Sequence, residues 1–505
     1  MNVLLVNPNR ERMPWPAVPI GLSNVATALA RAGHDVEVLD LTFVDDPAAA
    51  ALEAAQRRSP DVIGITVRNL DNCNFEAPTF YLTEIRDAVV RSLREGAPSA
   101  RLVIGGSAVN VSPKECFEYL EADFALVGEG EESMPRLLAA LESRADVDPA
   151  SVPGLIARNN GPRKLLTTIG PRAAPGDPIG GRAIARDFET SARSEAWRWV
   201  DLEHYAQNGA PFSIQTKRGC ALKCSYCVYN GIEGRTYRLR KPVDVVDEIE
   251  EAVLAHGVRS VDFVDSTFNL PLSHGRALLD ELSRRALTVE LSTMGLNPAG
   301  VRDDFIASMK RAGFRTVMCT PESASDVTLE SLQKGYDKGA VIRAAQALRR
   351  AELRTFWFFM IGAPGETLDT VKETLAFCEE HVPPDDVVLF CTGIRVYSGT
   401  PLEAYCKRIG WFEPDDPLFF PSWYLSPELD LAELYTLLVR AAETHPNWMT
   451  NAETVLSAGM VTAMKRAYGS LGWEGPFWQH LPKFHRFVAQ SRRRGLIAHH
   501  ARITR

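Results

Sequence analysis

The sequence predicts an α/β protein whose two strand-containing parts are joined by a linker and followed by a helical part. Short apolar strands alternate with helices over residues 1–145, and six further strand candidates alternate with helical segments over residues 207–410. Residues 146–206 are rich in Pro and Gly and hold little apolar sequence, which is typical of a linker. Within them, Val152–Ala157 has the pattern of a hairpin strand. Residues 411–505 are predicted to be helical, with interspersed aromatic residues.

Residues 1–145 have the pattern of a doubly wound parallel sheet, in which strands and helices alternate along the chain. The ligand of such a sheet lies across the carboxyl ends of its strands. The predicted strands are Val3–Val6, Val36–Asp40, Val62–Thr66, Leu102–Ile104 and Phe124–Val127, and the clearest helices are about Ile20–Arg31, ended by Gly33, and Thr83–Leu93.

Glycines follow two of these strands, at the edge of the sheet where a ligand binds. The run Gly105-Gly106-Ser107 follows one strand, and Gly128-Glu129-Gly130 follows the next. Such glycines let the backbone approach a large ligand closely, or they form sharp turns. The first strand–helix turn lacks the G-x-G-x-x-G run of dinucleotide-binding sites, which disfavours NAD as the ligand.

The most informative feature of the chain is a run of three cysteines, Cys220, Cys224 and Cys227, spaced C-x-x-x-C-x-x-C. Three thiolates on one tight loop can hold three irons of a 4Fe–4S cluster and leave the fourth iron open to a small molecule. A structural zinc site usually takes four ligands, and the nearest further candidates, His204 and Cys319, lie outside the loop. Disulfides are disfavoured because no apolar signal segment begins the chain, and nine cysteines in 505 residues do not make a secreted scaffold. We interpret the other six cysteines as small buried apolar residues: Cys73, Cys116, Cys319, Cys378, Cys391 and Cys406.

Composition and charge limit the class of protein. With 45% apolar and 24% charged residues the chain is ordinary globular material, and its net charge of −8 disfavours a nucleic-acid-binding surface. No stretch approaches the ~18 to 20 continuous apolar residues of a membrane helix. We therefore expect a cytoplasmic enzyme without a nucleic-acid or membrane partner.

The cysteine run resembles the signature of radical S-adenosylmethionine (SAM) enzymes. In that family the open iron holds the amino and carboxylate groups of SAM, and reductive cleavage of SAM releases a 5′-deoxyadenosyl radical. The family's partial (β/α)6 barrel keeps its chemistry at the carboxyl ends of the strands. Six strands here fit that barrel: Ser213–Thr216, Ser260–Val264, Val289–Thr293, Thr316–Thr320, Thr355–Ile361 and Val387–Thr392.

The strand ends of this barrel also resemble the SAM site of the family. The SAM-binding residues that the resemblance implies are Tyr226, Asp265, Glu322, Ser323, Gly362 and Arg395. It places Tyr226 and Gly362 close to the adenine and Glu322 with Ser323 at the ribose or the methionine end. Arg395 could pair with the methionine carboxylate. The alternative for each residue is a strand-end turn or a salt bridge within the barrel.

Four runs before the barrel resemble, in order, the cobalamin-binding domain that precedes many radical SAM domains: Pro19–Leu22, Ala32–Val36, Ile104–Ser107 and Gly128–Glu131. The cobalamin-binding residues that this resemblance implies are Arg68, Asn69, Gly105, Gly106, Ser107, Gly128, Glu129 and Gly130. The D-x-H-x-x-G run of domains that bind cobalt through histidine is absent, so the resemblance implies a displaced cobalamin base and no histidine beneath the metal. Arg68 lies in the polar loop expected beneath the cobalt, where it could discourage a sixth ligand or form a surface salt bridge.

Together the resemblances imply a cobalamin-dependent radical SAM methyltransferase that acts on an unactivated carbon of a small, natural-product-like molecule. Its cofactors are then a 4Fe–4S cluster, SAM and cobalamin, and its reductant is an external electron donor such as flavodoxin or ferredoxin. The alternative is a non-methylating cyclase, rearrangement enzyme or oxidase with the same cofactors. A cobalamin carrier or redox sensor without catalysis is disfavoured because the cysteine loop is intact. The sequence identifies neither the substrate nor the catalytic residues.

Overall fold

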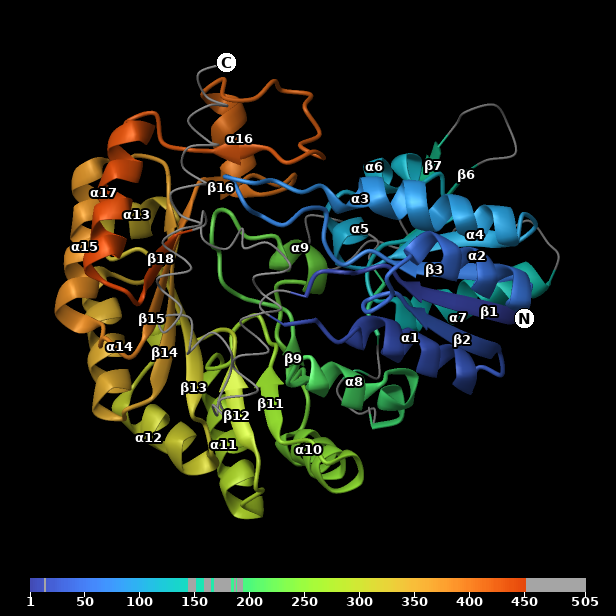
Figure 1. Cartoon of the computed structure of the whole chain (residues 1–505), viewed down its shortest axis with the longest axis horizontal. Coiled ribbons are helices and arrows are strands. Elements are labelled where there is room, and N and C mark those ends of the chain that lie inside the picture. The colour runs from blue at the N-terminus through green and yellow to red at the C-terminus, as the bar shows by residue number, and fades with distance from the viewer. Residues whose placement is uncertain are drawn as a thin grey trace.

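The structure is a computed structural model, and it describes residues 1–12, 15–143, 151–158, 165–167, 183–185, 188 and 194–450. These residues form an N-terminal α/β domain and a curved parallel sheet whose outer face is covered by helices (Figure 1). Within the described ranges, no helix is both long and apolar enough to cross a membrane.

The N-terminal domain is built on a seven-stranded sheet in the order β2-β1-β3-β4-β5-β6-β7. Its parallel strands are β1 (Asn2–Asn7), β2 (Asp35–Asp40), β3 (Val62–Thr66), β4 (Arg101–Gly105) and β5 (Phe124–Leu126), and its antiparallel ones are β6 (Leu155–Arg158) and β7 (Leu165–Thr167). The five predicted strands are thus confirmed. Within the segment predicted as a linker, β6 overlaps the predicted hairpin strand Val152–Ala157, and β7 was not predicted. Both strands extend this sheet at one edge.

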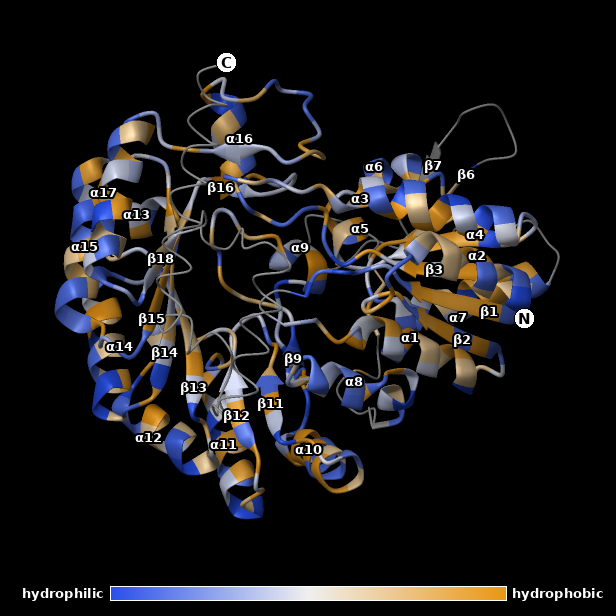
Figure 2. Cartoon of the chain, viewed as in Figure 1, coloured by the Kyte–Doolittle hydropathy of each residue, from blue (hydrophilic) through white to orange (hydrophobic). Residues whose placement is uncertain are grey.

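Helices cover both faces of the sheet, as a doubly wound fold requires. One face carries α1 (Ile20–Arg31) and α7 (Gly130–Glu142). The other face carries α2 (Pro47–Arg58), α3 (Tyr81–Glu84), a π-helical segment at Ile85–Val90, α4 (Arg91–Gly96), α5 (Ser107–Val111) and α6 (Pro113–Tyr119). The central strands are apolar along their length whereas the helices have mixed faces (Figure 2), as expected for strands buried on both sides.

The second sheet is parallel throughout and confirms the predicted partial barrel. Its strands are β8 (Phe212–Ile214), β11 (Ser260–Phe263), β12 (Glu290–Thr293), β13 (Thr316–Glu322), β14 (Arg354–Ile361) and β15 (Val387–Thr392). Each lies within two residues of its predicted ends. Two isolated bridges, Leu291 to Phe314 and Leu296 to Cys319, continue the sheet between β12 and β13.

Helices on the outer face separate the barrel strands along the chain (Figure 1). They are α10 (Pro242–His256), α11 (Leu272–Arg285), α12 (Asp303–Ala312), α14 (Lys338–Arg350) and α15 (Leu368–His381). Trp357 and Phe359 of β14 belong to the core beneath these helices. Because side chains alternate along a strand, Phe358 and Met360 face the barrel interior, and they are only half-buried.

A seventh parallel strand, β18 (Trp448–Thr450), pairs with β15 and was not predicted. It follows α17 (Leu431–Thr444), and Trp448 is buried against the rings of Phe390 and His445, with centroids 5.6 and 3.9 Å away. Three residues are too few to display a strand alternation in the sequence. The described part of the predicted helical region therefore also holds strands, and residues 451–505 lie outside the described residues.

Candidate functional site

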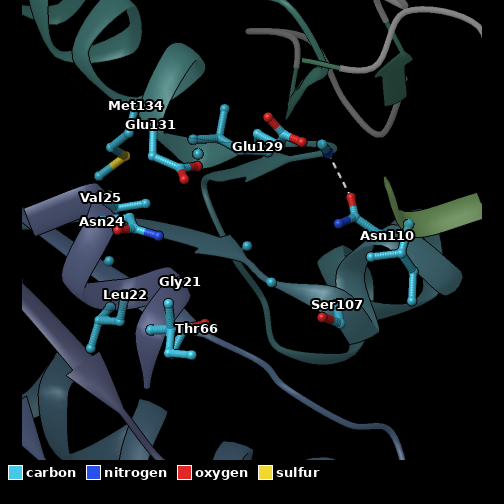
Figure 3. A pocket seen from close by; sticks show the side chains of 18 of the residues that line it. Gly21, Leu22, Asn24, Val25, Thr66, Ser107, Asn110, Glu129, Glu131 and Met134 are labelled. Carbon is cyan, nitrogen blue, oxygen red and sulfur yellow. Dashed lines mark hydrogen bonds between the residues drawn. The ribbon is translucent and has the colours of Figure 1, made fainter. Parts of the chain in front are cut away.

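A cavity of about 270 Å³ lies at the carboxyl ends of β3, β4 and β5, between α1 and α7 (Figure 3). This is the edge at which doubly wound sheets bind their ligands. Six of the eight residues predicted to bind cobalamin line it: Gly105, Gly106, Ser107, Gly128, Glu129 and Gly130. The structure thus brings together the glycine runs that follow two separate strands.

Glycines make room for this cavity in different ways. At Gly21 on α1, no atom lies within 4 Å of the position that a Cβ would occupy, so this glycine faces open space. At Gly106, φ is +101° and a Cβ would lie 2.7 Å from the carbonyl oxygen of Val67, so the turn itself requires glycine. Gly128 has φ +103° and sits against the backbone of Ala183, so chain packing explains it without a ligand.

The cavity holds polar groups as well as apolar ones. Asn24 on α1 is 6% exposed, its Nδ2 has no hydrogen-bond partner, and it is directed into the cavity in Figure 3. Asn110 accepts a hydrogen bond from the backbone N–H of Gly128, with 2.5 Å between Oδ1 and N (Figure 3). The unpartnered amide of Asn24 can therefore bond to a ligand.

The barrel closes one side of the same cavity through Gln215, Arg218 and Glu233. Arg218 is 7% exposed and pairs with two carboxylates of the N-terminal domain, Glu131 at 2.7 Å and Glu129 at 3.0 Å. These barrel residues were not predicted. A polar residue beside a strand end is too common a signal to single them out, although Arg218 stands two residues before the first cysteine of the loop.

The three cysteines lie on a loop that is closed at its base. Strand β9 (Lys217–Arg218) pairs antiparallel with β10 (Arg238–Leu239), and the backbone N–H of Cys220 donates to the carbonyl of Gly234 at 3.0 Å. Gly219 has φ +90° and packs against the backbone of Thr236, where a side chain has no room. The chain therefore forms a fixed base beneath the cysteine run.

Cys220 and Cys224 are buried and Cys227 is half-buried. Burial, together with a smaller contribution from negative charge on Cys224 and Cys220, raises the pKa of Cys227 to about 12, so the three thiols are electrostatic neighbours. Metal binding requires deprotonated thiolates, which a bound cation stabilises. Over the residues that the structure describes, no three His, Cys, Asp or Glu side chains are arranged around one metal position. The metal-binding role of these cysteines thus stays a prediction from their spacing.

Asp265 anchors the strand that leads into this loop. Its buried carboxylate accepts hydrogen bonds from the backbone N–H of Thr216 at 2.7 Å and from Nζ of Lys217 at 2.8 Å. The hydroxyl of Thr216 donates to Oδ2, the oxygen that also accepts from Lys217, at 2.5 Å. These contacts occupy Asp265 within the protein, and its predicted contact with SAM stays a prediction.

Tyr226, Glu322 and Lys334 form a buried polar cluster beside the cysteine loop. The hydroxyl of Tyr226 donates to Oε1 of Glu322 at 2.6 Å, and Nζ of Lys334 donates to the same oxygen at 3.0 Å and to the hydroxyl at 3.2 Å. Glu322 adopts φ +65°, and its Oε2 is buried without a hydrogen-bond partner. Two predicted residues, Tyr226 and Glu322, thus meet, together with Lys334, which was not predicted.

Ser323 and Gly362 build turns at the ends of β13 and β14. The buried hydroxyl of Ser323 bonds to that of Thr374 at 3.2 Å and accepts from the backbone N–H of Ser325 at 3.1 Å. Gly362 has φ +117°, and its N–H donates to Oε2 of Glu366 at 2.6 Å. Burial raises the pKa of this Glu366 carboxyl to about 7. The turn alternative weighed for both residues accounts for these contacts.

Arg395 does not face the cysteine loop with a free guanidinium. Its Nε donates to Oδ2 of Asp71 at 2.8 Å, and its other nitrogens donate to four backbone carbonyls, those of Leu418, Phe419, Ser422 and Val396. Both charged side chains are buried. Asp71 belongs to the loop after β3, so this ion pair joins the two domains. The contacts match the salt-bridge alternative and do not support the methionine carboxylate as a partner.

Arg68 and Asn69 are exposed at the carboxyl end of β3 and do not line the cavity. The charge of Arg68 opposes the rise that burial causes in the pKa of Tyr229, which begins the helix after the last cysteine. Arg68 therefore lies near the cysteine-loop side of the domain boundary.

Family comparisons support both halves of this arrangement. A family model described as the radical SAM superfamily matches residues 214–378, and one described as a B12 binding domain matches residues 14–138. The first match contains the cysteine loop and the second contains the glycine runs of the cavity.

Individual relatives cover most of the chain. A tryptophan 2-C-methyltransferase of Streptomyces laurentii is 29% identical over 449 residues, which is 78% of this chain and 72% of that protein. An anaerobic magnesium-protoporphyrin IX monomethyl ester cyclase of Synechocystis sp. is 26% identical over 69% of this chain and 66% of its own length. The solved structure of the radical SAM methyltransferase TsrM from Kitasatospora setae, with cobalamin and a [4Fe-4S] cluster bound, has a TM-score of 0.78 and 26% identity, covering 98% of this chain and 99% of that one.

Proposed function

The chain belongs to the cobalamin-binding radical SAM enzymes, and we propose that it transfers a methyl group from SAM to an unactivated carbon of a small molecule. One observation carries the proposal: the glycine-lined cavity of the cobalamin-binding domain is completed by Gln215, Arg218 and Glu233 of the domain that bears the cysteine loop. Methyl transfer with radical chemistry needs the two cofactors close together, and this shared cavity supports that arrangement.

The cavity residues fit a corrin cofactor. Gly21 leaves open space in the cavity, and the unpartnered amide of Asn24 offers a hydrogen bond inside it. Glu129 and Glu131 stand at its edge, where carboxylates can accept from the carboxamide arms of a corrin. We place the cobalamin there, with the predicted residues from Gly105 to Ser107 and from Gly128 to Gly130 around it.

The cofactors supply the difficult chemistry, cobalamin as carrier of the methyl group and the cluster as electron donor to SAM, and the protein supplies position and charge. Cys220, Cys224 and Cys227 are the three thiolates that would hold the cluster. Beside them, Oε2 of Glu322 lacks a partner and Lys334 has used two of its three N–H donors. We assign this acceptor and this cation to SAM, the carboxylate to its ribose or methionine end and the ammonium to its methionine carboxylate.

Arg68 and Asn69 are assigned to the lower face of the corrin. They follow β3 at its carboxyl end, they are exposed on the side of the cysteine loop, and no histidine precedes them in a D-x-H-x-x-G run. A permanently charged guanidinium cannot ligate a metal. Arg68, which lies outside the cavity, would therefore face a corrin that extends toward the cysteine loop without ligating its metal.

The substrate is placed between the domains, at the open end of the barrel. Phe358 and Met360 present apolar surface to the interior from one side. On the other side, Asp262 is 2% exposed, accepts from the hydroxyl of Ser292 at 2.7 Å and keeps its Oδ2 without a partner. An apolar body with an N–H or O–H donor fits this pairing, and the tryptophan substrate of the TsrM structure belongs to that class. We expect the enzyme to act in the cytoplasm with flavodoxin or ferredoxin as reductant.

The test is isotope tracing with methyl-labelled SAM, a reductant and candidate substrates under anaerobic conditions. Label in the product, with release of S-adenosylhomocysteine, supports methyl transfer, and 5′-deoxyadenosine released in parallel reports radical cleavage. The similarity to the cyclase gives a second candidate with a distinct outcome. Formation of 5′-deoxyadenosine with an unlabelled, cyclised or oxidised product overturns the methyltransferase proposal in favour of that reaction.

A further inference from the structure

A chain of hydrogen bonds runs along the cavity wall from the cobalamin-binding domain to the cysteine loop. Nη2 of Arg218 donates to Oε1 of Glu131 at 2.7 Å, and Nε of Arg218 donates to Oε1 of Gln215 at 3.1 Å. Nε2 of Gln215 donates to Oε1 of Glu233 at 2.9 Å. Oε2 of Glu233 then accepts from the backbone N–H of Gly219 at 3.1 Å. The last residue immediately precedes Cys220.

The direction of this chain is fixed by the chemistry of its members. A guanidinium only donates and a carboxylate only accepts, so Gln215, between Arg218 and Glu233, has to turn its oxygen to the first and its amide nitrogen to the second. The carboxylates at both ends are partly buried and Arg218 is buried, which strengthens charge-assisted bonds relative to those in water. The four side chains therefore have one arrangement in which all the bonds form together.

These side chains also form part of the cavity surface, so a ligand in the cavity meets them directly. Glu131, Arg218, Gln215 and Glu233 all line it. Long polar side chains lose rotamer entropy when they are held in one conformation. A ligand that contacts these side chains favours the conformation in which the bonds form, and the same conformation holds the N–H of Gly219 beside Cys220. A cluster that fixes the cysteine loop favours that conformation too, so each ligand biases the arrangement that the other meets.

We propose that Arg218, Gln215 and Glu233 are positioning residues that couple the two cofactor sites, so that a bound cluster increases the affinity for cobalamin and bound cobalamin favours cluster assembly. The inference rests on the proposed function, because it takes cobalamin as the ligand of the cavity. Linkage makes the two effects equal in free energy. The sequence separation between Glu131 and Glu233 explains why the sequence alone does not reveal the connection.

The experiment measures the dissociation constant for hydroxocobalamin by equilibrium dialysis, on the full chain without a cluster and after anaerobic cluster reconstitution. We expect reconstitution to tighten binding at least about fivefold in the unaltered protein, the lower end of common coupling energies. We call the dissociation constant without the cluster divided by that with the cluster the coupling ratio. Gln215→Leu should reduce this ratio to less than about twofold, because it removes both bonds at the centre of the chain. Gln207→Leu is the matched control, since Gln207 is an exposed glutamine that bonds only to Glu203 within its own helix, at 3.1 Å.

A pair of exchanged residues separates positioning from general damage. Gln215→Glu keeps the acceptor for Arg218 but sets a carboxylate against Glu233, so the ratio should fall. The double variant Gln215→Glu with Glu233→Gln restores a donor between the two positions and keeps the net charge, so the ratio should recover. The electron paramagnetic resonance spectrum of the reduced cluster, with and without hydroxocobalamin, should change in the unaltered protein and the double variant and not in Gln215→Leu.

Each result bears on one claim. An equal dissociation constant with and without the cluster in the unaltered protein, or a full ratio retained in Gln215→Leu, overturns the coupling while leaving cobalamin as a cofactor. Failure of the exchanged pair to recover the ratio overturns the assignment of the effect to this hydrogen-bond chain. A protein that binds no hydroxocobalamin in either state overturns the proposed function itself.

Discussion

The buried ion pair between Asp71 and Arg395 is the contact whose removal should most weaken the packing of the two domains. Asp71 lies on the loop after β3 and Arg395 on β16 (Ile394–Arg395) of the barrel, and their side chains are 0% and 3% exposed. We consider the changes Asp71→Ala and Arg395→Met, singly and together. Asp71→Ala leaves the guanidinium of Arg395 without its carboxylate. Arg395→Met leaves the carboxylate of Asp71 and four backbone carbonyls without their donor.

The expected magnitude follows from burial. Removing one partner of a buried pair typically costs about 3–5 kcal/mol, because the remaining charge is uncompensated. Asp71→Ala belongs in that range, since the guanidinium keeps its four carbonyl bonds. Arg395→Met removes those bonds as well, at about 1 kcal/mol each, and should cost more. The double variant should cost at least about 2 kcal/mol less than the sum of the single changes, because no lone charge remains.

The assay is urea unfolding, monitored by tryptophan fluorescence and by far-UV circular dichroism. A two-domain chain need not unfold in one step, so where the two probes differ, the first transition is the one compared between variants. Asp304→Ala is the control: its pair with Arg276 is 59% and 46% exposed and should contribute no more than about 1 kcal/mol. If Asp71→Ala shifts the free energy of unfolding no further than Asp304→Ala does, or if the two single costs simply add, the buried pair does not hold the domains together as argued.

Four further outcomes test the cofactor sites and the turn at Gly362. Replacing Cys220, Cys224 and Cys227 together by Ala should lower reconstituted iron from about four atoms per chain to background and abolish 5′-deoxyadenosine formation, as iron analysis and chromatography will show; normal iron content would refute the cluster site. Gly21→Leu should block the cavity and raise the dissociation constant for cobalamin at least about tenfold. The protein should stay folded, because a Cβ there meets no atom within 4 Å and replacing a helical glycine is stabilising by about 0.5–1 kcal/mol. Unchanged binding would show that cobalamin does not occupy this cavity. Lys334→Met should weaken SAM binding in isothermal titration about tenfold or more, whereas Arg395→Met should weaken it far less; the reverse order would restore the methionine role first predicted for Arg395. Burial raises the pKa of Glu366 to about 7, so the folded state binds a proton more tightly than the unfolded state, and the free energy of unfolding should fall as pH rises from about 4.5 to 7. The loss should be on the order of 3 kcal/mol, and Glu366→Gln should remove most of it in urea midpoints measured across that pH range. An unchanged pH dependence in Glu366→Gln would contradict the shift.

The strands could be predicted from the sequence because each leaves a local signal. Buried strands such as β3 and β15 are continuous apolar runs, and parallel strands covered on both faces have that pattern. The strand β18 has three residues and pairs with β15, which lies more than fifty residues earlier, so its existence depends on a tertiary contact and not on local preference. The short strand β7 is hidden for the same reason, inside a segment whose Pro and Gly content indicates a linker. The strand β6 overlaps the hairpin strand predicted at Val152–Ala157, because a run of apolar residues marks it locally.

The site divides in the same way between local and assembled features. The cysteine spacing and the glycine runs are local, and the structure places the glycine runs around one cavity. Gln215, Arg218 and Glu233 acquire their role only when the barrel closes against α7, and nothing in their own sequence neighbourhood distinguishes them from surface polar residues. Lys334 is a further case: a lysine near the end of a helix is usually solvated, and only the fold buries it between Tyr226 and Glu322.

The two buried cations near the barrel's open end show why hydrogen-bond saturation decides between similar candidates. Arg395 was the natural choice for an anionic ligand because it follows the sixth strand, yet all five of its N–H donors already have acceptors. For Arg395 to bind a ligand carboxylate, some of these bonds would have to break first, and the buried guanidinium could not form hydrogen bonds with water in their place. Lys334 retains one N–H donor beside the cysteine loop, and its neighbour Glu322 retains one acceptor. Unmet bonding capacity in a buried group is costly unless a ligand meets it, and this cost favours the Lys334–Glu322 pair over Arg395 as the binding group.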